Sequence, residues 1–192
     1  MEIVHERVML RLMDANDVEK LFAIVEGNKE IWTYLIAKME SSQDMEQYVE
    51  TAIKQYEKGR DLPFVVIDQK TNEVVGSTRL YNISKESKTF ELGQTWYHPS
   101  VQRTSINTEC KYMLLQYAFE ELQMLRVQIK TDLRNEKAQR AIERLGAVKE
   151  GVLRNERKLP SGYVRDAVVY SIIASEWPVV KEQLLKKMDL YK

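Results

Sequence analysis

The sequence has few of the residues that build metal clusters and disulfides. Its 192 residues include one cysteine, Cys110, and two histidines, His5 and His98. A single cysteine excludes an internal disulfide and a cysteine-based zinc cluster, and two histidines leave little for a histidine metal site. We therefore expect a protein without a bound metal.

The chain also lacks an excess of charge of either sign, and it lacks long apolar runs. Lysine and arginine total 29, aspartate and glutamate total 29, and the formal net charge is zero. This balance argues against bulk binding to nucleic acid or to a membrane surface, which usually needs a basic excess. No apolar run approaches the ~20 residues of a membrane span, and the N-terminus lacks the apolar core of a signal peptide. We expect a soluble, cytoplasmic protein with no nucleic-acid or membrane partner.

Glycine and proline are scarce as well, with seven and four residues, and no Pro/Gly-rich linker divides the chain. The length suits one domain, and 44% hydrophobic residues can bury a sizeable core. We therefore expect a single domain over residues 1–192.

The spacing of apolar residues predicts the order of strands and helices. Strands are predicted at 3–12, 62–68, 73–83, 89–97, 126–131, 148–159 and 163–173. Helices are predicted at 16–27, 41–59, 105–122, 135–145 and 175–189, with a short helix or loop at 31–39. This order indicates an α/β fold with a central mixed sheet of six to seven strands and helices on both faces, including a parallel crossover between Thr89 and Thr131.

The stretch from Tyr97 to Glu109 joins a predicted strand directly to a predicted helix. Such a junction aims unpaired backbone N–H groups and the positive end of a helix dipole at one point, which suits a phosphate or pyrophosphate. A solvent-exposed helix start is the alternative interpretation. Asn135 opens a second short helix, where it is also a good N-cap residue.

Several short motifs make this order resemble the GCN5-related N-acetyltransferase (GNAT) superfamily, and in particular its RimJ/RimL-type branch. The resemblance extends from about Arg7 to Trp177. It rests on Glu91-Leu92-Gly93, His98-Pro99, the turn from Gln102 to Glu109, Asn135-Glu136-Lys137-Ala138, Arg144-Leu145-Gly146-Ala147 and Glu150-Gly151-Val152-Leu153-Arg154. It implies acetyl-coenzyme A (acetyl-CoA) as the donor co-substrate and a primary amine as the acceptor.

The resemblance also implies which residues bind the coenzyme. The phosphate turn would be Gln102, Arg103, Thr104, Ser105, Ile106 and Asn107, and Asn135 would contact the pantetheine arm. A backbone N–H of Trp96 or Tyr97 would polarise the thioester carbonyl.

Two positions depart from the family pattern. Ser105 stands where the first glycine of the turn is expected, which is tolerable if its φ is helical and harmful if its φ must be positive. Ile142 occupies the position of a tyrosine that protonates the leaving thiolate in many members.

For the general base we favour Glu91, against the alternative of a sheet-surface carboxylate paired with a lysine or arginine. Trp32, Tyr34 and Tyr163 would line the acceptor pocket, or else belong to the core.

These observations predict an acetyl-CoA-dependent N-acetyltransferase that acetylates a protein N-terminus or a small-molecule amine by direct transfer in a ternary complex. A catalytically weak or inactive acyl-CoA-binding or scaffold protein of the same fold is the alternative. A homodimer is also open, because dimers are frequent among similar proteins.

Overall fold

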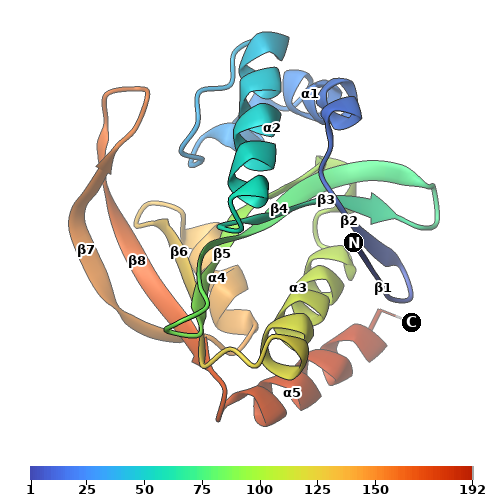
Figure 1. The fold of residues 1–192 in the computed structure, drawn as a ribbon, viewed down its shortest axis with the longest axis vertical. Helices are drawn as coiled ribbons and strands as arrows, with labels where there is room; N and C mark the ends of the chain where they lie inside the picture. Colours follow the sequence, from blue (N-terminus) through green and yellow to red (C-terminus); the bar gives the residue numbers. More distant parts are fainter. Residues whose placement is uncertain (192) are drawn as a thin grey trace.

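The structure is a computed structural model that describes residues 1–191, and it is built around one mixed sheet of eight strands (Figure 1). The strand order across the sheet is β1-β2-β3-β4-β5-β6-β8-β7. The strands are β1 (Glu2–Val4), β2 (Val8–Leu12), β3 (Leu62–Asp68), β4 (Glu73–Ser84), β5 (Thr89–Tyr97), β6 (Arg126–Asp132), β7 (Val148–Lys158) and β8 (Val164–Ile173). The helices are α1 (Val18–Glu26), α2 (Ser42–Glu57), α3 (Ile106–Gln116), α4 (Glu136–Arg144) and α5 (Trp177–Asp189).

Helices cover both faces of the sheet, as expected from the order of the elements. Figure 1 shows α1 and α2 on one side and α3 and α5 on the other. Each side has its own apolar core: Leu21 and Met45 are completely buried in the first, and Ile106 and Leu184 in the second. Within residues 1–191, no helix combines the length and apolar character needed to cross a membrane.

The expected count of six to seven strands was too low, because the predicted strand at 3–12 is a hairpin. It folds into β1 and β2, which pair antiparallel. The carboxylate of Glu109, on α3, accepts the N–H groups of Arg7 (2.7 Å) and Val8 (3.0 Å) and thereby holds the turn. This contact joins residues about a hundred positions apart, so local apolar spacing carries no sign of it.

Most predicted helix ends are confirmed by their caps. Ser41 accepts the N–H of Asp44 and forms a capping box at the start of α2. Asn135 accepts the N–H of Ala138 at 3.0 Å and caps α4, and Gly27 follows the last residue of α1. The segment 31–39 contains only the end of a short 3-10 turn, Lys29–Trp32.

Two predicted helix ends are corrected. The helix expected at 105–122 is regular only to Gln116 and then continues as a π-helical turn, Tyr117–Glu121. The helix expected from residue 175 starts later: α5 begins after Glu176, whose carboxylate accepts the N–H of Ile173 at 3.0 Å.

β5 and β6 are parallel, as expected, but they pair over a short stretch only. Thr89 to Glu91 pair with Arg126 to Gln128, and the pairing then ends. β6 continues beside β8 as far as Asp132, while β5 continues beside β4 as far as Tyr97. The two strands therefore part beyond Glu91, and we call the space between them the β5–β6 opening.

Candidate active site

A β-bulge marks the part of β5 that has left β6. Ser77 lies opposite Trp96 and Arg79 lies opposite Gly93, so Thr78 alone faces both Gln94 and Thr95. Gln94 has a positive φ of 49°. A bulge bends its strand and increases the local twist, which turns the following residues away from the neighbouring strand.

Trp96 and Tyr97 follow the bulge, and their side chains point into the protein. Trp96 is 3% exposed and its ring packs in the core beneath α1 and α2. The Tyr97 hydroxyl is buried beside the Cys110 thiol, and burial raises the pKa of both groups. At these two positions the backbone, and not the side chain, is the part available to the β5–β6 opening.

The loop after β5 is rigidly built. The Nδ1 atom of His98 accepts the N–H of Ser100 at 3.1 Å and lies 2.6 Å from its hydroxyl. Thr104 then donates its hydroxyl to the Val101 carbonyl at 2.7 Å and accepts the N–H of Ile106 at 3.3 Å. Thr104 thus ties down the first turn of α3.

The backbone conformation of Ser105 shows whether a residue other than glycine fits this position of the turn. Its φ and ψ are −64° and −22°, which are helical values that any residue adopts. The positive φ in this loop, 62°, falls on Arg103 instead. A side chain at Ser105 is therefore sterically tolerated. The side chain of Ile106 is fully buried, so only its backbone faces the loop.

The turn after β5 lies against the start of α4. Lys137 donates to the Gln102 side-chain oxygen at 2.6 Å, and the Gln102 amide nitrogen lies 3.4 Å from the Tyr97 carbonyl. Asn135 caps α4 in the same place. The N-terminal ends of α3 and α4, with Arg103 and Lys137 beside them, therefore face one region, which favours an anion.

Glu91 is the last residue of β5 that pairs with β6, and it lies on the face of the sheet that carries α1 and α2. Its neighbours Phe90 and Leu92 point to the α3 side, so Glu91 points the other way. Lys130, from β6, places its ammonium 3.1 Å from one carboxylate oxygen, and Asn82 donates to the other at 2.8 Å. The Glu91–Lys130 pair therefore crosses the β5–β6 opening where the strands begin to part.

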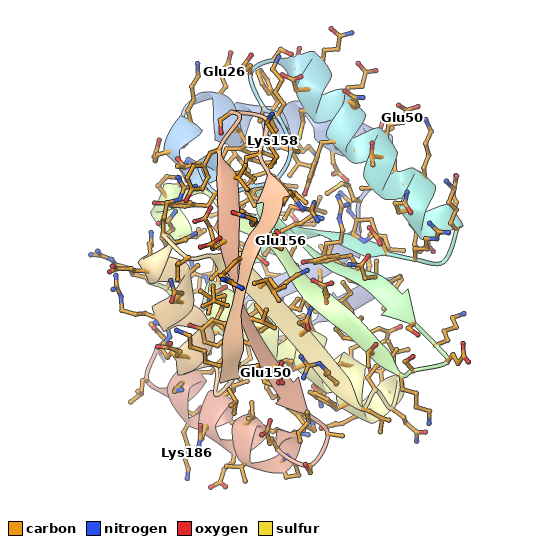
Figure 2. All side chains as sticks on the ribbon, turned by 90° about the vertical axis from the view of Figure 1, so that its left-hand side faces the viewer. Glu26, Glu50, Glu150, Glu156, Lys158 and Lys186 are labelled. Atoms are coloured by element: carbon orange, nitrogen blue, oxygen red, sulfur yellow. The ribbon has the colours of Figure 1, made fainter. Side chains whose placement is uncertain are left out.

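This ion pair continues into a larger charged cluster. The ammonium of Lys130 is also 3.6 Å from Glu156, which pairs with Arg165 at 3.0 Å. Figure 2 shows Glu156 on β7, with Glu150 toward the α5 end of the strand and Lys158 toward its opposite end. Each side chain of the Glu91–Lys130–Glu156–Arg165 cluster is at most 15% exposed.

Two of the three predicted acceptor-pocket residues come together around one arginine. The guanidinium of Arg134 lies 3.6 Å from the ring centre of Tyr163 and 5.6 Å from that of Tyr34. The Arg134 guanidinium also makes two hydrogen bonds to the carboxylate of Asp132, at the end of β6. The segment after the 3-10 turn and the β7–β8 hairpin are thereby joined next to the β5–β6 opening.

Trp32, the third predicted pocket residue, lies in the core between α2 and β5. It is 8% exposed and packs edge-on against Tyr48 and Trp96, with ring centres 5.4 and 5.3 Å away. Together with Gln94 it borders a cavity of only about 10 Å³.

A larger cavity, of about 330 Å³, adjoins the start of α3, where Ser105 forms part of its wall. His5, Arg7, Lys70 and the end of α5 also border it. In the described part of the chain, no group of three or more His, Cys, Asp or Glu side chains is placed to hold a metal ion.

Four basic residues of this region were not singled out from the sequence: Lys111, Lys130, Arg134 and Lys137. The position of Lys130 could have been predicted from the sequence. It alternates with the buried Val127 and Ile129 along β6, which places it on the same face of the sheet as Glu91. Lys137 follows a helix cap and Arg134 precedes it, which are ordinary places for exposed charge. The burial of Lys111 could not be predicted from the sequence, because Lys111 lies beside the apolar stripe of its helix and not within it.

The chain matches known acetyltransferases over most of its length. A family model described as "Acetyltransferase (GNAT) domain" matches residues 7–148. The candidate ribosomal N-acetyltransferase YdaF of Bacillus subtilis (strain 168) is 28% identical over 176 residues, which cover 91% of this chain and 95% of YdaF.

Solved structures share the fold. A GCN5-related N-acetyltransferase from Brucella melitensis has a TM-score of 0.90 at 26% identity, covering 98% of this chain and 85% of that one. Mycobacterium smegmatis RimJ, solved in complex with CoA-disulfide, has a TM-score of 0.82 at 20% identity, covering 94% and 88% of the two chains. The chain belongs to the GNAT family of acetyltransferases, and it is similar over most of its length to a relative named as a candidate ribosomal N-acetyltransferase.

Proposed function

We propose that this protein transfers the acetyl group of acetyl-CoA directly to a primary amine, in a complex that holds both substrates. The observation that carries this proposal is the β5–β6 opening. It has backbone N–H groups after a bulge on one strand, a carboxylate at its narrow end and two helix N-termini beside its wide end.

The phosphates of the coenzyme would bind at the wide end. The turn from Gln102 to Asn107 and the start of α4 at Asn135 offer N–H groups and helix dipoles, and Arg103 and Lys137 add positive charge. Lys137 holds the Gln102 side chain in place for this role. The pantetheine arm would then follow β5 toward Glu91.

The thioester carbonyl would accept a hydrogen bond from the backbone N–H of Trp96 or Tyr97. Such a donor stabilises the negative charge that develops on the oxygen as the carbon becomes tetrahedral. The donor is held in place before the reaction by the bulge and by β4, so it needs little reorganisation. Binding both reactants in one complex supplies a further part of the rate enhancement.

Glu91 would accept the proton that the acceptor amine must lose. The amine nitrogen then forms a bond to the carbonyl carbon, and the carbon–sulfur bond breaks to release the thiolate. Ile142 is 8% exposed and has no acidic group that could donate a proton, so the thiolate leaves unprotonated or takes its proton from water.

The acceptor class we favour is the N-terminal amine of a protein. YdaF is named as a candidate ribosomal N-acetyltransferase, and this chain aligns with almost all of it. A small-molecule amine is the competing acceptor, and both have the same reacting group.

Calorimetric titration with acetyl-CoA, followed by thiol release over a panel of peptides and small amines, tests the proposal. We expect micromolar coenzyme binding and thiol release with at least one class of amine. Absence of binding at millimolar acetyl-CoA would contradict the coenzyme site, and binding without turnover on any amine would favour an acyl-CoA-binding scaffold.

Glu91→Gln tests the base. We expect kcat to fall by about a hundredfold or more, the usual contribution of a general base, while the affinity for acetyl-CoA changes by less than about threefold. Glu50→Gln is the control, because Glu50 is an exposed carboxylate on α2 that also pairs with a lysine. Equal rates for Glu91→Gln and the control would remove Glu91 from the mechanism.

A further inference from the structure

Lys111, on α3, is buried beneath the sheet although it carries an amine. It is 6% exposed, and within residues 1–191 it forms no ion pair with a carboxylate. Lysine is almost never buried without such a partner, because taking an ammonium out of water is unfavourable. Its burial without a carboxylate partner points to a role other than stability.

The partners of Lys111 are two threonines on either side of the bulge. Its ammonium donates to the Thr95 hydroxyl at 2.6 Å and to the Thr78 hydroxyl at 3.1 Å, and the two hydroxyl oxygens are 2.8 Å apart. Thr95 also donates to the Gly93 carbonyl at 3.4 Å. One ammonium is thus linked to both ends of the bulge and to the β4 residue that faces it.

We propose that Lys111 is a positioning residue for acetyl transfer, because its ammonium holds, through Thr95, the bulge that aims the backbone N–H of Trp96 or Tyr97. This proposal rests on the proposed function. Thr95 immediately precedes Trp96, so a loss of the Lys111–Thr95 bond acts directly on the proposed carbonyl donors. Small displacements of such groups reduce rates strongly while leaving distant contacts intact.

The protonation of Lys111 offers a readout of this role. Burial lowers the pKa of Lys111 to about 8. Its ammonium donates to Thr78 from β4 and Thr95 from β5, and the titratable group that acts on its pKa is Cys110, on its own helix. The charged form donates to both hydroxyls, whereas the neutral amine can accept from one of them, so the hydrogen bonds at the bulge change direction near this pH.

The first test is an NMR titration that needs no substrate. In the wild-type protein we expect the amide signals of Gln94 to Tyr97 to shift with a midpoint near pH 8. In Lys111→Met, which keeps the length of the side chain and removes the amine, we expect that titration to vanish. Lys186→Met is the control, because Lys186 is 74% exposed on α5. Bulge signals that titrate equally in both variants, or in neither the variants nor the wild type, would overturn the proposal.

The second test separates kcat from KM. In Lys111→Met we expect kcat to fall by tenfold to about a hundredfold, with the KM for acetyl-CoA changed by less than about twofold. Wild-type kcat should decline above pH 8, and this decline should be missing in Lys111→Met. Unchanged kcat, or a loss confined to KM, would contradict a positioning role.

Thr95→Val keeps the test decisive if Lys111→Met fails to fold. It removes the hydroxyl that accepts the hydrogen bond from the Lys111 ammonium, and it retains the volume of the side chain. We expect the same loss of kcat, and in the double variant no further loss, because both changes remove one interaction. If the wild type shows no transfer to any amine, the proposed function fails, while the NMR titration still decides whether Lys111 holds the bulge.

Discussion

Two lysines approach β5 from opposite faces of the sheet, and they are compensated in different ways. Lys130, on the α1/α2 face, lies between Glu91 and Glu156 at 3.1 and 3.6 Å. Lys111, on the α3 face, has only two threonine hydroxyls. The first arrangement balances charge locally, whereas the second leaves a buried cation uncompensated. Groups whose titration is strongly perturbed in this way concentrate at functional sites.

The largest effect we expect from this difference is a pH-dependent stability linked to Lys111. Its folded-state pKa, about 8, lies below the ordinary value of 10.5. Between these values the unfolded chain binds more protons than the folded one, so the free energy of unfolding rises with pH. Relative to Lys111→Met, the wild type should gain about 3 kcal/mol between pH 8 and pH 10.5.

Urea unfolding of both proteins across this pH range measures the difference. Other groups titrate in both proteins, so the difference between the two curves isolates Lys111. A constant difference from pH 7 to pH 10.5 would mean that Lys111 has an ordinary pKa in the folded state.

A smaller effect on stability is expected from Lys130→Met, because this substitution removes a cation that is paired with carboxylates. The substitution leaves Glu91 and Glu156 close together without their shared cation, although Arg165 still pairs with Glu156. We expect a loss of about 2 kcal/mol in the free energy of unfolding at pH 7, because a mostly buried carboxylate becomes unpaired.

The matched control for Lys130→Met is Lys54→Met on α2. Lys54 also pairs with a glutamate, Glu50, but both side chains are more than half exposed. Exposed pairs contribute at most about 1 kcal/mol, so this variant should be close to wild type. Equal losses in the two variants would show that the cluster around Lys130 behaves as an ordinary surface pair.

The smallest effect on stability is expected from the neutral hydroxyl partners of Lys111. Thr78→Val removes one of the two hydroxyls that accept from Lys111 and keeps the shape of the side chain. We expect a loss of about 1 kcal/mol at pH 7, and a smaller loss at pH 10, where the amine is neutral and its hydrogen bonds are weaker. Equal losses at the two pH values in urea unfolding would indicate that Thr78 serves Thr95 alone.

Much of this fold could be predicted from local patterns. Strands β3, β4 and β8 follow runs of apolar residues, and the caps Ser41 and Asn135 act within their own helices. Such features depend on neighbours a few positions apart, which a sequence displays directly. The β1–β2 hairpin was missed because its turn is held by Glu109, a distant residue on α3.

Only part of the candidate site could be predicted, because some of its contacts join residues that are distant in the sequence. Spacing and family resemblance indicated Glu91, the turn from Gln102 to Asn107, and Asn135. Tyr34 and Tyr163 were expected at the acceptor side, but the guanidinium of Arg134 that joins them was not.

The sequence by itself determined the order of strands and helices and the GNAT family, because periodicity and short motifs are local properties of the chain. The tertiary structure alone decided that Ser105 is helical, that β5 is bulged at Gln94, and which charge faces which carboxylate. These features depend on strand register and on contacts between distant segments. A one-residue change in register would reverse which face each side chain occupies.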